Sequence, residues 1–129
     1  MKYGFLSELD ARKVKEANST GRARWRLLSM LIYRSEVLDR TIVVPAMFET
    51  DFASVPRIPM AYWLAGDTAQ AAAVVHDYLC VYDYTQGRIT WKKAARVFLE
   101  AMAFEQVPLW RRWVMYSAVL LSKPMEIWR

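Results

Sequence analysis

The chain has 129 residues, of which 55% are hydrophobic and 24% are charged, and its formal net charge is +5. This length supports one domain with a substantial core, residues 1–129, and is too short for two. The single cysteine, Cys80, excludes an internal disulfide framework and a four-ligand zinc module. The longest charge-free runs are about half of the roughly 20 residues that a membrane-spanning helix needs. We therefore expect a soluble protein of a reducing compartment, with no transmembrane segment.

The N-terminal residues 1–23 look irregular and basic. A turn cluster lies at Asn18–Gly21. Residues 11–26 hold six Lys or Arg side chains and one acidic residue, Glu16. A basic arm of this kind can bind phosphate or an acidic protein surface, so nucleic acid is a possible partner through residues 11–26. A solvated loop is the alternative, because no nucleic-acid-reading motif accompanies the charge.

The next segments have the composition of strands. Arg24–Tyr33 is predicted as one long buried strand, and Thr41–Val44 as a second, with Ser35–Arg40 as the hairpin connection. A third short strand is expected at Phe48. It runs into an extended loop, because the two prolines between residues 56 and 59 forbid a helix.

Helical patterns dominate the second half, and they indicate three helices. The predicted helices and their start signals are Ala69–Leu79 after Asp67 or Thr68, Trp91 to about Phe104 after the capping residue Thr90, and Leu109 to about Ser122 with Pro108 in its first turn. Residues Tyr82–Gly87 are expected to form a loop. A strand-rich half followed by a helix-rich half favours the α+β class, with a small antiparallel sheet packed on about three helices.

One group of polar residues could carry chemistry. His76 is the only histidine, and it lies with Asp77 near the end of a largely apolar helix. A polar group in such surroundings needs a partner. The proline-fixed loop supplies the candidates, which are Thr50, Asp51, Ser54 and Arg57.

This polar set has three possible interpretations. Asp51, His76 and Asp77 could bind a divalent metal that activates water. Alternatively, Ser54 could be a nucleophile with His76 as its base and one aspartate orienting the ring. In the third, the set is a buried hydrogen-bond network that joins the two halves of the domain, with Arg57 paired to Asp77.

The last predicted helix is a candidate binding surface. It carries apolar stripes on adjoining faces, one through Trp113 and one through Trp110, with Arg111 and Arg112 beside them. A basic amphipathic helix can lie on a membrane or on a protein partner. A core helix with extended arginines is the other interpretation. Similarly, Cys80 lies one turn after His76, where it could be a ligand, a nucleophile or a small core residue.

Two stretches of the sequence resemble a known family. Thr50–Arg57 reads TDFASVPR and His76–Leu79 reads HDYL. This pair is similar to the signature of a small-protein family of unknown function that occurs chiefly in tailed bacteriophages and prophages. The resemblance covers roughly residues 24–122. Met47 is a departure, because many members have glycine there.

The resemblance implies a bacteriophage gene product, present in the bacterial host cytoplasm or the virion. We expect it to act by binding a protein partner, as a virion component or as a modulator of a host protein. A small hydrolase acting on cell-wall peptide or nucleic acid, with or without a metal, is the alternative.

Overall fold

The computed structural model describes residues 2–14, 24–50 and 69–122. Within these residues, two antiparallel sheets come from the N-terminal half and the helices come from the C-terminal half. The α+β class is therefore confirmed. The first sheet has the order β1-β4-β5, with β1 at Gly4–Phe5, β4 at Leu31–Ser35 and β5 at Arg40–Val44. The second has the order β2-β3-β6, with β2 at Ala11–Lys13, β3 at Trp25–Leu27 and β6 at Glu49–Thr50.

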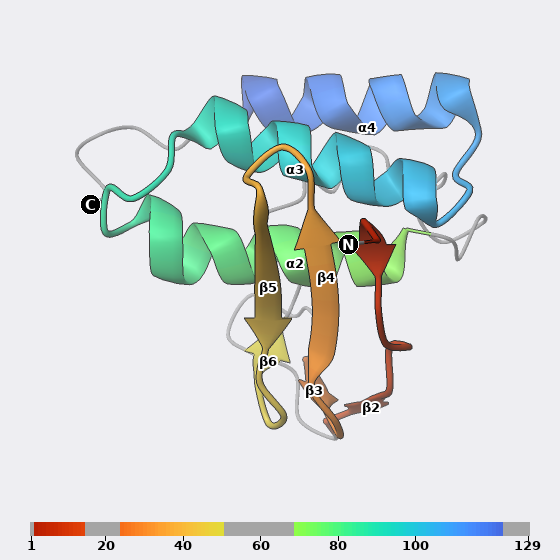
Figure 1. Cartoon of the computed structure of the whole chain (residues 1–129), viewed down its shortest axis with the longest axis vertical. Coiled ribbons are helices and arrows are strands. Elements are labelled where there is room, and N and C mark those ends of the chain that lie inside the picture. Colours follow the sequence, from red (N-terminus) through yellow and green to blue (C-terminus); the bar gives the residue numbers. More distant parts are fainter. Residues whose placement is uncertain (1, 15–23, 51–68, 123–129) are drawn as a thin grey trace.

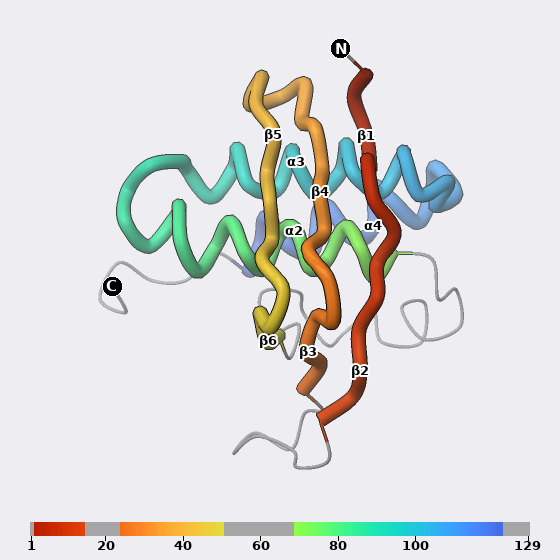
Figure 2. Tube along the Cα trace, turned by 60° about the horizontal axis from the view of Figure 1, so that its bottom comes forward, coloured from red at the N-terminus to blue at the C-terminus, as the bar shows by residue number. Residues whose placement is uncertain are grey.

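The helices are stacked behind the first sheet. Helices α2 (Gln70–Leu79) and α3 (Trp91–Phe104) lie side by side across β4 and β5, and α4 (Leu109–Leu121) packs on α3 on the side away from the strands (Figures 1 and 2). Sheet, helix pair and outer helix thus form three layers. The main core lies between the first two layers.

The predicted hairpin is confirmed, and its side chains alternate as a half-buried sheet requires. Leu31 pairs with Val44, and Tyr33 pairs with Ile42, and all four side chains are buried. The intervening Val43 is 43% exposed. Period-two alternation therefore turns one face of the hairpin toward α2 and α3.

The prediction of one long strand over 24–33 is wrong. The chain leaves the second sheet after Leu27, exposes Leu28, Ser29 and Met30, and enters the first sheet at Leu31. Both Leu27 and Leu31 are wholly buried. Because the two buried leucines belong to different sheets, the three residues between them form the crossing.

Residues 4–5 and 11–13 form strands, so the irregular structure expected there is also wrong. The segment follows the 24–35 segment along its length (Figure 2), as shown by hydrogen bonds from the Leu6 amide to the Ile32 carbonyl and from the Leu28 amide to the Asp10 carbonyl. Short strands with few apolar residues give little periodicity, and pairing with a stronger neighbour determines their conformation.

The helix boundaries match the prediction closely, with one difference. Thr90 caps α3 by accepting a hydrogen bond from the Lys93 amide at 3.0 Å. The difference is that α2 continues into a π-helical turn, η1 (Cys80–Tyr84), so the expected loop begins only at Thr85. The predicted caps Asp67 and Thr68 lie outside the described residues.

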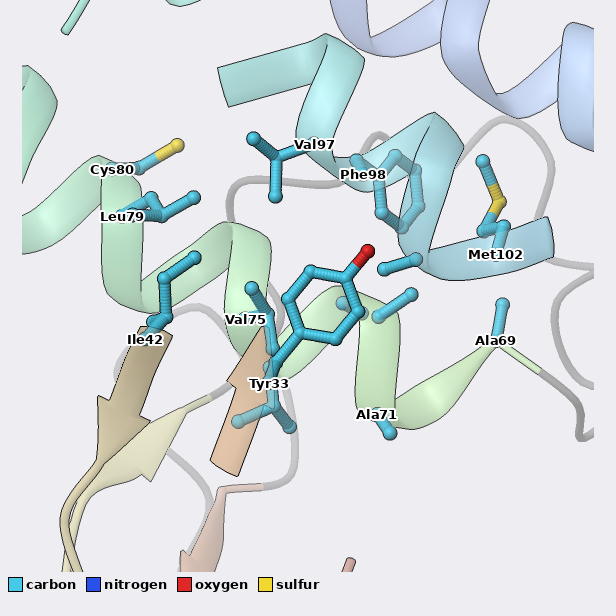
Figure 3. Packing of buried hydrophobic residues seen from close by; sticks show 14 of the residues in the cluster. Tyr33, Ile42, Ala69, Ala71, Val75, Leu79, Cys80, Val97, Phe98 and Met102 are labelled. Carbon is cyan, nitrogen blue, oxygen red and sulfur yellow. The ribbon is translucent and has the colours of Figure 1, made fainter. Parts of the chain in front are cut away.

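The core is built from the inner face of the hairpin and the facing sides of α2 and α3. Tyr33 extends from β4 into the space between the helices, among Val75, Leu79, Phe98 and Met102 (Figure 3). The apolar residues that repeat at helical spacing along α3 are all wholly buried: Ala94, Val97, Phe98, Ala101 and Met102. Alanines on both helices allow the close approach that this core requires.

A single carboxylate joins the hairpin to α3. Glu100 Oε1 accepts hydrogen bonds from the hydroxyls of Tyr33 at 2.7 Å and Ser35 at 2.9 Å. Its Oε2 accepts from the backbone amides of Glu36 and Val37, each at 3.0 Å. Burial, with the Glu100 hydrogen bond second, raises the pKa of Tyr33, so that its hydroxyl stays a donor.

The backbone conformation at Met47 shows why glycine suits this position. Its φ is 74°, in the left-handed region that favours glycine. This conformation turns the chain between β5 and β6, so that the Met47 amide bonds the Leu27 carbonyl at 2.8 Å. A glycine at this position would adopt the same conformation without strain.

Candidate functional site

His76 lies in the contact between α2 and α3 and is 0% exposed. Its ring centroid is 5.2 Å from that of Phe98 and 5.6 Å from that of Trp91. Cys80, one turn later, places its Sγ 3.7 Å from Nε2, so the predicted proximity of these two side chains is confirmed. Aromatic rings, a thiol and packed helices therefore surround the imidazole.

This environment sets the charge of His76. Burial alone lowers its pKa to about 3, because a charged imidazolium would lose its hydration there. The ring is therefore neutral at physiological pH. A neutral, sealed imidazole suits a packing and hydrogen-bonding role better than contact with a substrate.

Asp77 points in another direction from His76, since consecutive helical residues differ by about 100°. It is 7% exposed and lies one turn after Val74 on the same side of α2. Val74, Gln70 and Thr50 line a pocket of about 120 Å³ between α2 and the second sheet; its other described lining residues are Leu9, Ala11, Trp25 and Leu27.

The predicted contact between the Thr50–Arg57 loop and the end of α2 can be examined only at Thr50, because the rest of this loop lies outside the described residues. This buried residue approaches α2 on the Gln70–Val74 side, which is not the side of His76. Asp51, Ser54 and Arg57 lie outside the described residues. The metal set of Asp51, His76 and Asp77, and the Ser54 nucleophile, therefore stay predictions. Within the described ranges, no three His, Cys, Asp or Glu side chains are grouped as a metal site requires.

Helix α4 differs from the core helix that was one interpretation of its sequence. Of its residues, only Met115 and Val119 are buried. Five large apolar side chains are exposed, and we call them the α4 face: Leu109, Trp110, Trp113, Val114 and Leu121. The predicted stripe through Trp110, Val114 and Leu121 is exposed. In the stripe through Trp113, by contrast, Tyr116 and Leu120 are half-buried and pack against the core. None of the described helices is long and apolar enough to cross a membrane.

The two arginines of α4 lie between its buried and exposed sides. Arg111 places its guanidinium over the Trp110 ring, 5.5 Å from the centroid. The Nε atoms of Arg111 and Arg112 are buried and have no hydrogen-bond partner among the described residues. Neither side chain forms an ion pair within that part of the chain. Two of the predicted binding residues thus carry positive charge beside the exposed tryptophans.

The basic segment 11–26 is described only at its two ends. Arg12 stands opposite Arg26 in the pairing of β2 with β3, and Arg26 stands opposite Glu49 of β6. Glu49 binds Arg26 at 2.7 Å and Arg24 at 3.2 Å, and the Arg26 hydrogen bond lowers its pKa. Part of the basic charge is therefore neutralised within the sheet, which leaves Arg12 and Lys13 exposed.

Two important carboxylates were missed from the sequence. Glu100 organises the hairpin, and Glu105 accepts hydrogen bonds at the start of α2 from the amides of Ala72 at 2.6 Å and Ala71 at 3.3 Å. Burial raises the pKa of Glu105 to about 7, against the lowering effect of these bonds. The sequence does single out Glu100, because it is the only charged residue between Arg96 and Glu105.

The fold and these sites define a small α+β domain with a sealed histidine and one exposed apolar helix. Residues 25–119 match the model of a family described as "Protein of unknown function (DUF1353)". The match covers most of the chain, so the chain belongs to this family. No curated protein and no solved structure matches it.

Proposed function

We propose that this chain is a bacteriophage protein that acts by binding another protein, either as a component of the virion or as a modulator of a host protein. The observation that carries the proposal is the α4 face. Its exposed fractions range from 42% at Val114 to 88% at Leu121. Contiguous exposed apolar surface of this kind marks interaction sites on soluble proteins.

The composition of the α4 face supports a protein partner. Tryptophan and arginine are the residues most enriched at the energetic centres of protein interfaces. Here Trp110 and Trp113 are about half exposed, and Trp113 is held edge-on against Tyr116 with 5.6 Å between the ring centroids. Rings held in place lose little freedom on binding. The proposed site of action is the host cytoplasm or the virion.

The hydrolase alternative receives less support. It requires some of Asp51, Ser54, His76 and Asp77 to contact cell-wall peptide or nucleic acid. His76 is sealed between α2 and α3, and Asp77 is 7% exposed. No specific observation on the described residues favours this function. The same holds for binding of nucleic acid through residues 11–26.

The proposal predicts a loss of partner capture when the α4 face is made polar. Tagged full-length wild type is expected to recover one defined protein from virions or from infected host cells. Val114→Asp should abolish that recovery, because it places a charge within the apolar contact. Quantitative mass spectrometry of the recovered proteins measures the effect.

Val43→Asp is the matched control, because Val43 is 43% exposed, against 42% for Val114, and belongs to β5, in a different layer of the fold from α4 (Figure 1). It should recover the partner as wild type does. Equal recovery by both aspartate variants, or no specific partner for wild type, would contradict the proposal. Thermal unfolding of all three proteins verifies that each is folded.

A further inference from the structure

The exposed residues of α4 follow a spacing that matches a second helix. Trp113 and Val114 lie three and four residues after Trp110, and Leu121 lies seven residues after Val114, which places them on one stripe along the helix axis. The thirteen residues of α4 give the helix a length of about 20 Å. A long, straight apolar stripe is the geometry of helix-to-helix packing.

The shape of the stripe also suits a helix. Ser117, which is exposed, follows Val114 on the same stripe, and Ala118 lies beside it. Ser117 stands one helical turn from both Trp113 and Leu121, so a small side chain separates two large ones. In ridges-into-grooves packing, a large side chain of the facing helix packs over such a small residue. The binding residues of the partner should therefore recur at helical intervals.

The charge around the stripe specifies the partner further. Helix α4 contains two arginines and no acidic residue, and the whole chain carries a net charge of +5. Among the described residues, neither Arg111 nor Arg112 has a carboxylate partner. A second copy of this chain would bring the same positive charge to the contact. Acidic side chains flanking an apolar stripe would complement it.

We propose that the partner presents an acidic amphipathic helix, which packs lengthwise on the α4 face with its carboxylates beside Arg111 and Arg112. This inference rests on the proposed binding function and names the chemistry of its partner. Recognition is then of the helix-in-groove kind, with apolar anchors at i, i+3, i+4 and i+7 and charge determining the choice between partners.

Two designed helical peptides of about 18 residues test this inference, because they are long enough to cover α4. Both carry the same leucine stripe, with glutamate on the remaining face of one peptide and lysine on that of the other. Titration calorimetry with the full-length protein should give a dissociation constant about tenfold lower for the glutamate peptide. The affinity should fall as salt is raised from 50 to about 500 mM.

Two variants assign the effect. The double variant Arg111→Gln with Arg112→Gln should lose the tenfold preference, and Val114→Asp should lose binding of the glutamate peptide. Val43→Asp should behave as wild type. Conservative glutamines are chosen because the Nε atoms of both arginines are buried, so that a reversed charge could disturb folding.

Several results would overturn the inference. These are no binding of the glutamate peptide, equal affinity for both peptides, or binding to phosphatidylglycerol vesicles without binding to the glutamate peptide, which would indicate a lipid surface. This inference can fail while the proposed binding function stands. If Val114→Asp abolishes capture of the natural partner while the arginine variant does not, α4 is the binding face and only the acidic chemistry is wrong.

Discussion

Replacing Glu100 by alanine is expected to lower the free energy of unfolding by about 4 kcal/mol. Four donors lose their acceptor in this variant, and two of them belong to Tyr33 and Ser35, which are wholly buried. A buried donor left without a partner costs about 1–3 kcal/mol. The effect is measured by urea denaturation at neutral pH.

Glu100→Gln should cost less than Glu100→Ala, for a reason that depends on the donors. The amide oxygen of glutamine can serve the backbone N–H groups of Glu36 and Val37. Its amide nitrogen can then donate to the hydroxyls of Tyr33 and Ser35, because a hydroxyl can rotate and accept. The matched control is Glu36→Gln in the same turn, where the side chain is exposed. Equal stability of Glu100→Ala and this control would contradict the assigned role.

Replacing His76 by phenylalanine is expected to remove most of the acid sensitivity of the α2–α3 contact. The folded-state pKa is about 3, against an ordinary value of 6.5. Above pH 6.5 the ring is neutral in both states, and its contribution to stability is fully present. Between pH 6.5 and 3 only the unfolded chain binds the proton. The free energy of unfolding of wild type therefore falls by about 1.4 kcal/mol for each unit by which the pH is lowered.

The free energies of unfolding of His76→Phe and wild type are measured at pH 7 and at pH 4. From pH 7 to pH 4, the value for His76→Phe minus that for wild type should rise by about 3 kcal/mol. Glu105 acts in the opposite sense, since its raised pKa of about 7 makes the native state bind a proton first as the pH falls. Its contribution is common to both proteins and cancels. A difference that does not change with pH would show that solvent reaches the imidazole.

The helices and the hairpin could be predicted from the sequence because their side chains repeat with a clear period. Val97, Phe98 and Ala101 follow the helical rhythm, and each is buried as expected. Leu28 and Met30 could not be placed this way. They are as apolar as their neighbours, yet both are about half exposed where the chain crosses between sheets. That crossing depends on pairing with distant residues.

The buried side of α4 was also beyond prediction. Nearly every face of this helix is apolar, so the period alone cannot select one. The contact with α3 uses Met115 and Val119, and Trp91 reinforces it by donating from its indole nitrogen to the Val119 carbonyl at 2.8 Å. Only the packing of the whole domain shows that the tryptophans of α4 are left outside.

The candidate polar site was predictable in part. The 100° separation of His76 and Asp77 follows from helix geometry, and the structure places the His76 ring against Phe98 of α3. The position of Thr50 beside Gln70 and Val74 could not be predicted, because apolar residues flank both His76 and Asp77 in the sequence. The carboxylates Glu100 and Glu105 have partners far along the chain, and local patterns do not report such partners.

Photochemical crosslinking from the α4 face tests whether this face binds a protein partner. A benzophenone amino acid is introduced in place of Trp113, and in a second protein in place of Val43, and infected cells and virions are irradiated. One covalent adduct with a defined protein is expected from position 113, and none from position 43. The same adducts from both positions, or none from position 113, would contradict the proposal.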